Sequence, residues 1–469
     1  MDMKNKHLDN LLSLLGINEY FNGNFKIIGS DPIIQSPHKL GEAASIALLS
    51  HAAAVAAVWN CKTGINQDIN IDIHDALHSL HTVHFIWTNG YKRSVKLYTE
   101  PTTGFYKCKD GRWIHLCSGP PYPKLKDGIL NFFNCNNYYE SVAKAVAKWN
   151  SYELEDALSC KNMLGAVART KEEWGNHPQG KYLSNVPVVE ITKINDGPKI
   201  PFTNGKHPLS GIKTVDFTHV LAGPRSTMGL AEYGADVVHV SSPSYLDPDI
   251  VNLTVNQGKK NAFIDFNQQS DIERFLNFSA EADIFAQSWR STVVEKFGLT
   301  PETLAKNSKS GIIYMSANCY GHGGPWQNRG GFEHIGQTAT GISVNEGSID
   351  NPKLVPTYYL CDLLTGYLAS AGMIAALLKR AKEGGSYHVK VSLARSAMWT
   401  QELGLIKNRK LLRNLPINDS NPKDLKLNEY DTVYGKLLCP APAAKLSKLK
   451  SKIQIGPRPY GADLLKWET

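Results

Sequence analysis

The sequence contains no uninterrupted apolar run that approaches the roughly 20 residues of a membrane-spanning helix. Its segment from Met1 to Asn10 is polar and lacks the apolar stretch of a secretory signal. Its eight cysteines form no CxxC pair and show no metal-ligand spacing. We therefore expect free thiols, no metal site and no membrane span. The default expectation is a soluble, cytoplasmic protein, with a mitochondrial or peroxisomal location left open.

Charge of one sign is not in large excess either. The chain has 51 Lys and Arg against 43 Asp and Glu, a formal charge of +8 over 469 residues. A basic cluster, KLSKLKSK, occupies Lys445 to Lys452, but no aromatic-interleaved or helix-turn-helix pattern accompanies it. We interpret the cluster as a solvated face or tail, and expect no nucleic acid partner. The positive balance suits a ligand that carries phosphates.

What the sequence does contain is a regular alternation of strand and helix patterns. The segment Lys206 to Val240 predicts a strand, a glycine-bearing turn, a helix and a second strand. Further candidates follow, with strands at 261–266, 284–288 and 311–317 and a helix at 271–282. This order predicts an α/β fold with a doubly wound parallel sheet that begins in mid-chain, after a linker rich in Gly and Pro at 195–208. The predicted domains are 1–200, 201–440 and a basic carboxyl tail at 441–469.

An internal repeat becomes visible when the chain is compared with itself. With Leu40 aligned on Leu360, the segment Leu40 to Ala76 matches Leu360 to Ser396 without a gap, as an Ala-rich helix, a Gly turn, an alternating strand and another helix. Glu42 then occupies the position of Asp362. Ala-rich helices also match by chance, so the alternative is that Glu42 is ordinary surface charge on a helix.

Four stretches resemble the class III CoA-transferases, the family of formyl-CoA transferase, carnitine CoA-transferase and alpha-methylacyl-CoA racemase. The first two are PLSGIKTVDFTHVLAGPRSTMGLAEYGADVVHV at 208–240 and NQGKKNAFIDF at 256–266. The other two are ADIFAQSWRSTVVEKFGLTPETL at 282–304 and GIIYMSANCYGHGGPWQNRGGFEHIGQTATG at 311–341. The resemblance implies a Rossmann-like CoA-binding domain with a smaller α+β domain. It also implies chains that interlock as a homodimer.

The resemblance implies that Asp362, before an Ala- and Gly-rich helix, is the nucleophile. Its carboxylate would attack an acyl-CoA thioester, and CoA would pass to an incoming carboxylic acid through an aspartyl-CoA thioester. Glu333 matches the acidic residue of the active-site loop, where it would orient the reacting group or stabilise charge. From the residues alone, Asp362 can also be a helix N-cap, and Glu333 a solvated loop carboxylate.

CoA or acyl-CoA is expected as a substrate, with no tightly bound cofactor. The resemblance implies that the CoA groove is lined by residues that follow the strands: His219, Leu221, Ala222, Ile264 through Asn267, Ser288, Trp289, Arg290 and Lys296. His219 can equally be a histidine of the core. Ser241 and Ser242 stand where the family has an acidic and then a basic residue, which removes one expected contact to phosphate or ribose.

Three other functions remain open. An alpha-methylacyl-CoA racemase would abstract a proton with a histidine and an aspartate, but Phe332-Glu333 stands where the His-Asp pair is expected. A catalytically inactive, CoA-binding relative would fit the altered phosphate contact. A nicotinamide dehydrogenase is disfavoured because the turn HVLAGP at 219–224 lacks GxGxxG. The acyl group and the acceptor acid are not identifiable from the sequence.

Overall fold

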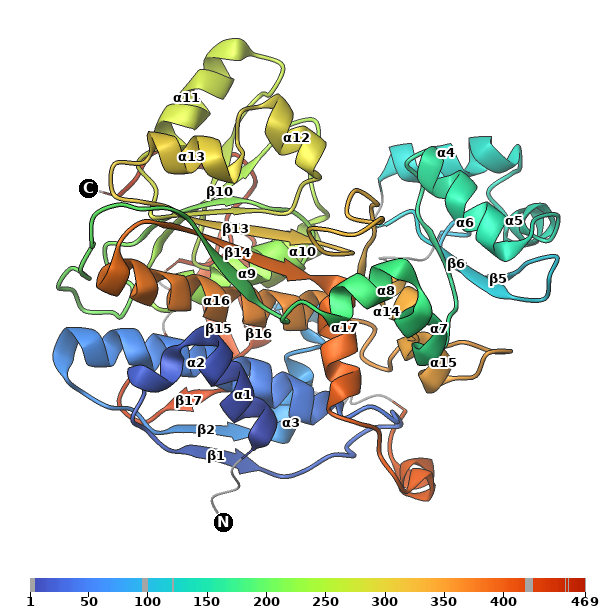
Figure 1. Ribbon diagram of the computed structural model, residues 1–469, viewed down its shortest axis with the longest axis horizontal. Coiled ribbons are helices and arrows are strands. Elements are labelled where there is room, and N and C mark those ends of the chain that lie inside the picture. The colour runs from blue at the N-terminus through green and yellow to red at the C-terminus, as the bar shows by residue number, and fades with distance from the viewer. Residues whose placement is uncertain are drawn as a thin grey trace.

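A seven-stranded sheet forms the centre of the protein (Figure 1). The computed structural model describes residues 5–94, 100–119, 122–417, 425–451, 453 and 455–468. All strand pairs in this sheet are parallel except the last. The spatial order is β11 (Lys260–Phe263), β10 (Asp236–Ser241), β9 (Lys213–Phe217), β12 (Ile284–Gln287), β13 (Ile313–Asn318), β14 (Ser386–Ser392) and β8 (Glu190–Asn195).

The sheet is doubly wound, as the sequence predicts. The chain proceeds from β9 outward to β10 and β11, returns to β12 on the other side of β9, and continues to β13 and β14. The order therefore reverses between β9 and β12, and open α/β sheets bind ligands beyond the carboxyl ends of the strands at such a switch point. The predicted strands and helix at 206–317 agree with the observed elements to within about three residues at each end.

The strands of this sheet are buried on both sides because helices cover both of its faces. In β12, the side chains of Ile284 and Ala286 belong to the core on one face, and Phe285 points to the core on the other face. The second face carries α11 (Gln269–Ser279), α12 (Ser291–Lys296) and α13 (Pro301–Asn307). The first face carries α9 (Ala222–Ala231), α16 (Cys361–Glu383) and α17 (Leu393–Glu402).

The amino-terminal segment adds a second helix and sheet layer against α16 (Figure 1). Its long helix α2 (Leu40–Thr63) packs along α16, and alanines on α2 allow the two helices to approach closely. Beyond α2 lies a three-stranded sheet in which β2 (Ile69–Asp72) is flanked by β1 (Phe25–Ile28) and β17 (Lys445–Leu446). The helices α1 (Lys6–Leu15) and α3 (Ile73–His78) complete this layer.

A smaller α+β unit lies to one side, in cyan and green in Figure 1, as predicted. Its sheet contains β5 (Gly104–Lys107), β6 (Trp113–Leu116) and β7 (Gly165–Val167). Three helices pack on this sheet and the chain then returns through two short ones: α4 (Pro123–Phe133), α5 (Tyr139–Val146), α6 (Ser151–Cys160), α7 (Lys171–Asn176) and α8 (Pro178–Ser184).

Strand pairing crosses the predicted domain boundaries. β8, from the region 1–200, pairs with β14 of the central sheet. A further sheet joins β15 (Leu427–Thr432) and β16 (Gly435–Pro440) to β3 (Trp87–Thr88) and β4 (Tyr91–Lys92). β17 lies in the predicted basic tail and pairs with β2, so Lys445 is part of a sheet; Lys452 lies outside the described residues.

Two helices in the described part of the chain, α2 and α16, are long and apolar enough to cross a bilayer by length and composition alone. The sequence still has no uninterrupted apolar run of that length, because small polar residues and single charges interrupt both helices. Within the most apolar window of each, 83% of α2 and all of α16 is buried by protein. Helices that are apolar all round are typical of the core of a large protein as well as of membranes.

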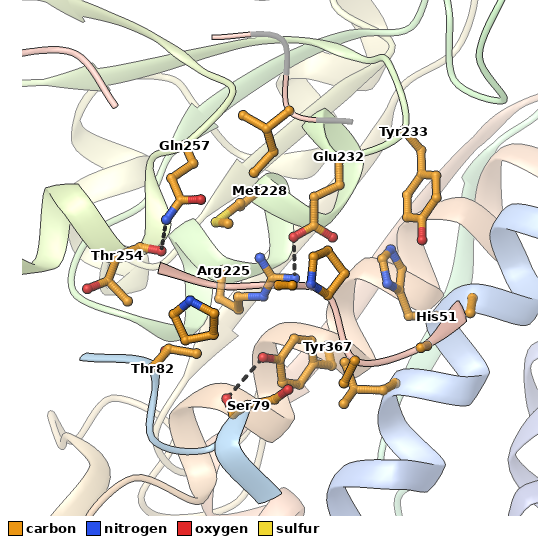
Figure 2. A pocket seen from close by; sticks show the side chains of 18 of the residues that line it. His51, Ser79, Thr82, Arg225, Met228, Glu232, Tyr233, Thr254, Gln257 and Tyr367 are labelled. Carbon is orange, nitrogen blue, oxygen red and sulfur yellow. Dashed lines mark hydrogen bonds and ion pairs between the residues drawn. The ribbon is translucent and has the colours of Figure 1, made fainter. Parts of the chain in front are cut away.

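The contact between the amino-terminal layer and the central sheet has a polar centre (Figure 2). Arg225 on α9 donates to Glu232 at 2.9 Å, and Tyr367 on α16 donates to the carbonyl oxygen of Ser79 at 3.0 Å. These groups line a cavity of about 50 Å³. Since buried charges are costly unless they are paired, Arg225 and Glu232, which lies at the carboxyl end of α9, satisfy each other within this contact.

Candidate active site

Asp362 lies in the first turn of α16 and is buried, with 4% of its surface exposed. Its Oδ2 atom has no hydrogen-bond partner among the residues that the structure describes. A buried polar atom without a partner is costly and calls for an explanation, of which a catalytic role is one. The N-terminal end of a helix also favours negative charge, so this position suits a carboxylate that must react as an anion.

Glu333, the first residue of α14 (Glu333–Thr340), holds the start of α16 in place. Its Oε1 accepts from the backbone N–H of Cys361 at 2.9 Å, and its Oε2 accepts from the N–H of Asp362 at 2.6 Å. Gln337, one turn later on α14, donates to Oε1 at 2.7 Å. The first turn of a helix has no intrahelical acceptors for these N–H groups, and the Glu333 carboxylate supplies them. The structure therefore brings the two predicted carboxyl groups together.

The two carboxyl groups influence each other's protonation. Burial raises the pKa of Asp362 well above its usual range, and the nearby charge of Glu333 raises it further. Burial also raises the pKa of Glu333, while the N–H groups that it accepts act in the opposite direction. Because Glu333 has these donors and Asp362 has none, the negative charge of the pair is better placed on Glu333. The protonated form is therefore favoured more strongly at Asp362 than at Glu333.

Two non-glycine residues near the site have strained backbone. Tyr358, four residues before Asp362, has φ of 62°, and Val220, after β9, has φ of 63°. A β-branched residue such as Val220 rarely adopts this conformation, and such strain gathers at functional sites. The backbone N–H of Val220 donates to Asp247 at 2.7 Å, and the same carboxylate accepts from the hydroxyl of Tyr122 at 2.5 Å. Asp247 thus joins the smaller unit to the turn after β9.

A cavity of about 720 Å³ opens at the switch point of the sheet, between the central sheet and the smaller unit. Four of the residues predicted to contact CoA line it: His219, Ser288, Trp289 and Arg290. The N–H of His219 donates to Ser288 Oγ at 3.0 Å, which joins the ends of β9 and β12. The cavity extends past Cys319 to Gly331 and Phe332, the residues immediately before Glu333.

The other predicted contacts lie outside this cavity's lining. Leu221 and Ile264 are fully buried, and Ala222 is 8% exposed as the first residue of α9. Asn267 is exposed and donates to Asp265, while Lys296 is exposed with its Nζ atom 5.0 Å from the ring of Phe297. The structure does not bring these five residues together with the other four. Their role in CoA binding stays a prediction.

Sequence reasoning predicted Trp289 but missed Tyr245 and Tyr122, the aromatic residues that continue from it along the cavity. The ring of Trp289 lies 5.3 Å from Tyr245, Tyr245 stacks on Tyr122 at 4.9 Å, and Tyr122 stacks on Phe332 at 6.0 Å. This row of rings leads from the end of β12 to the residue beside Glu333. Tyr122 comes from the smaller unit, and no local pattern indicates that it meets Tyr245. Gln337 was missed too, although a residue one turn after a candidate site residue on a helix was a usable signal.

Lysine and arginine side chains also line the cavity, at Lys124, Lys161, Arg290 and Arg329. They outnumber the two acidic lining residues, Glu295 and Glu302, and give the cavity a net positive rim that suits phosphate groups. Ser241 and Ser242, which stand where the family has an acidic and then a basic residue, do not line the cavity. Within the described residues, no group of three or more His, Cys, Asp or Glu side chains is arranged to hold a metal ion.

Comparison with known proteins identifies the family of the part of the chain that carries Asp362 and Glu333. Residues 209–441 match the model of CoA-transferase family III. The acetyl-coenzyme A transferase nodX of Hypoxylon pulicicidum is 30% identical over 332 residues, which cover 66% of this chain and 56% of that protein. The succinyl-CoA:glutarate CoA-transferase of Mus musculus is 30% identical over 201 residues, which cover 40% of this chain and 46% of that protein.

A solved structure is similar as well. The crystal structure of Rv3272 from M. tuberculosis has a TM-score of 0.40 and 28% sequence identity, and the match covers 43% of this chain and 57% of that one. The chain spans about half the length of the curated relatives named above. The predicted family is confirmed, and residues 209–441 belong to CoA-transferase family III.

Proposed function

We propose that the protein transfers CoA between carboxylic acids, with Asp362 as the nucleophile. The observation that carries this proposal is the buried carboxyl group of Asp362, whose Oδ2 has no partner while its backbone is held by Glu333. The substrates are an acyl-CoA and a carboxylic acid. The cavity that ends beside Glu333, with its positive rim, supports CoA as the carried group.

The proposed reaction has four steps. An ionised Asp362 oxygen attacks the thioester carbonyl, the C–S bond breaks, and a mixed anhydride and CoA thiolate result. The thiolate attacks the Asp362 carbonyl, which gives an aspartyl-CoA thioester and releases the donor acid as a carboxylate. The acceptor carboxylate then attacks this thioester, the C–S bond breaks, and a second anhydride and CoA thiolate result. CoA thiolate attacks the acceptor carbonyl, so that a new acyl-CoA leaves and Asp362 is again a carboxylate.

Glu333 is a positioning residue in this proposal. Both of its oxygens accept hydrogen bonds, from two backbone N–H groups and from Gln337. A racemase base needs a free oxygen near the substrate, so this arrangement favours transfer over proton abstraction. Asp362, with its free Oδ2, is the group left to react.

Covalent trapping tests the mechanism. Incubation with a panel of acyl-CoAs followed by hydroxylamine or borohydride should modify the peptide that contains Asp362, as mass spectrometry can detect.

Asp362→Asn should abolish turnover, because an amide is not an anionic nucleophile, yet calorimetry should still detect CoA binding. Retained turnover would remove Asp362 from the mechanism, and a label on Glu333 would exchange the two roles. Binding of CoA without turnover in the wild-type protein would indicate an inactive CoA-binding relative.

A further inference from the structure

The amino-terminal layer repeats the strand pairing around the active site. β1 and β2 are parallel, with Phe25 opposite Ile69 and Ile28 opposite Asp72. When Leu40 is aligned on Leu360, β2 falls on the carboxyl-terminal part of β14, whose partners on the parallel strand β13 are Met315 through Asn318. β1 therefore takes the place of β13.

The strands on the other side of β2 and β14 also correspond to each other. β17 runs antiparallel to β2, with Lys445 opposite Asn70, and β8 runs antiparallel to β14, with Glu190 opposite Lys390. In the same alignment Asn70 falls on Lys390. Three strands in each sheet thus share direction and register, although β17 and β8 lie at unrelated places in the sequence.

The helices between these strands end at corresponding glycines, both with a positive φ. Gly64 follows α2 with φ of 72°, and its N–H donates to the carbonyl oxygen of Asn60 at 2.8 Å. Gly384 follows α16 with φ of 75°, and its N–H donates to Arg380 at 2.9 Å. The donors of these two hydrogen bonds are corresponding positions in the alignment, and so are the acceptors. α2 and α16 therefore match at their carboxyl ends as well as in length.

The amino-terminal ends of the two helices carry the same carboxylate arrangement. Asp31 accepts from the backbone N–H of Gly41 at 3.3 Å and from the N–H of Glu42 at 2.7 Å, one on each oxygen. Glu333 accepts in this way from Cys361 and Asp362. Gly41 and Glu42 are the positions that correspond to Cys361 and Asp362. Burial raises the pKa of Asp31 to about 6, in the same direction as for Glu333.

The two sites differ at the residue that would react. Both oxygens of Glu42 are engaged: Oε1 accepts from Asn5 at 3.3 Å, and Oε2 lies 3.0 Å from the ammonium group of Lys39. Lys39 occupies the position of Tyr359, which is buried beside Asp362. The large cavity also stays away from Glu42, since none of its lining residues comes from the described part of 5–119.

We infer that Asp31 and Glu42 form a second carboxylate site, the counterpart of Glu333 and Asp362, which Lys39 and Asn5 hold closed. The chemical class assigned to this site rests on the function proposed for Asp362. The site shares the backbone construction of the Glu333–Asp362 site, but the Glu42 carboxylate is paired, and the large cavity has no lining residue from the described part of 5–119. A nucleophile needs a free lone pair and a bound substrate within about 3 to 3.5 Å.

Carbodiimide coupling to glycine ethyl ester tests the closure without any need for enzymatic activity. Peptide mass spectrometry of the whole chain should show slow modification of Glu42. Lys39→Met should raise the rate by about two- to fivefold, the range expected from loss of a surface ion pair. Lys26→Met, on the exposed side of β1, is the matched control and should leave the rate unchanged. Equal rates in the wild-type protein and Lys39→Met would overturn closure by Lys39.

Trapping with acetyl-CoA and hydroxylamine tests whether the site reacts. A hydroxamate at Asp362 and none at Glu42 agrees with a closed site, and Glu42→Gln should then keep turnover within about twofold. A hydroxamate at Glu42, or loss of turnover in Glu42→Gln, would overturn the inference. If acetyl-CoA and the other acyl-CoAs label neither residue, the proposed transfer mechanism fails, and the carbodiimide rates still decide whether Lys39 closes the site.

Discussion

At the scale of single residues, the raised pKa of Asp362 predicts how activity depends on pH. The nucleophile must be ionised, and burial and the charge of Glu333 both favour its protonated form. We expect kcat/KM to rise with pH up to the apparent pKa of the Asp362–Glu333 pair and then to level off. Initial rates with saturating acceptor acid at pH 5 to 9 measure this profile. A rate that is flat across the range would show that Asp362 is already ionised in the free enzyme.

The same pKa makes a prediction for stability. A carboxyl group whose pKa is higher in the folded than in the unfolded state binds more protons when folded, so its ionisation costs stability as pH rises. Asp362→Asn removes that cost. The Tm of the Asp362→Asn variant should equal that of the wild-type protein near pH 4 and exceed it at pH 7 to 8. Differential scanning calorimetry at several pH values checks this, and a Tm below that of the wild-type protein at pH 8 would contradict it.

At the scale of elements, Glu333 connects α14 to the start of α16, and its replacement should loosen that helix end. Glu333→Ala leaves the N–H groups of Cys361 and Asp362 buried without acceptors, at a cost of about 2 to 4 kcal/mol. Glu333→Gln keeps one acceptor oxygen and should cost less. Urea unfolding gives the cost, and hydrogen exchange should show faster exchange at those two amides. Unchanged exchange would mean that the contact does not hold α16.

A positioning role also has a kinetic signature. If Glu333 only fixes where Asp362 stands, Glu333→Gln should lower kcat far more than it raises the KM for acyl-CoA, because the cavity residues that bind CoA are unchanged. A shift confined to KM would place Glu333 in substrate binding.

At the scale of the whole molecule, we propose that the chain forms a homodimer, since the family to which residues 209–441 belong implies interlocked chains. Light scattering should give twice the chain mass of 51.8 kDa. A monomer would mean that the packing of α2 on α16 within one chain replaces the contact between subunits. Hydrodynamic radius and mass measured together separate these two cases.

The sequence by itself determined what depends on local pattern. Alternating apolar residues and turn glycines specify the strands from β9 to β13 and the helices α9 and α11, and the small residues of 361–383 specify a helix with Asp362 at its start. These features were predictable because a strand or helix is selected mainly by residues within one or two turns of it. The match between 40–76 and 360–396 was visible for the same reason.

Only the tertiary structure decided which distant segments meet. β17 lies beside β2, Tyr122 lies beside Tyr245, and Asp31 accepts from the first turn of α2. None of these contacts has a local signal, since each joins residues whose own neighbourhoods are compatible with many partners. The cavity and the free Oδ2 of Asp362 likewise depend on contacts between distant segments, because burial and hydrogen-bond satisfaction are properties of the packed molecule.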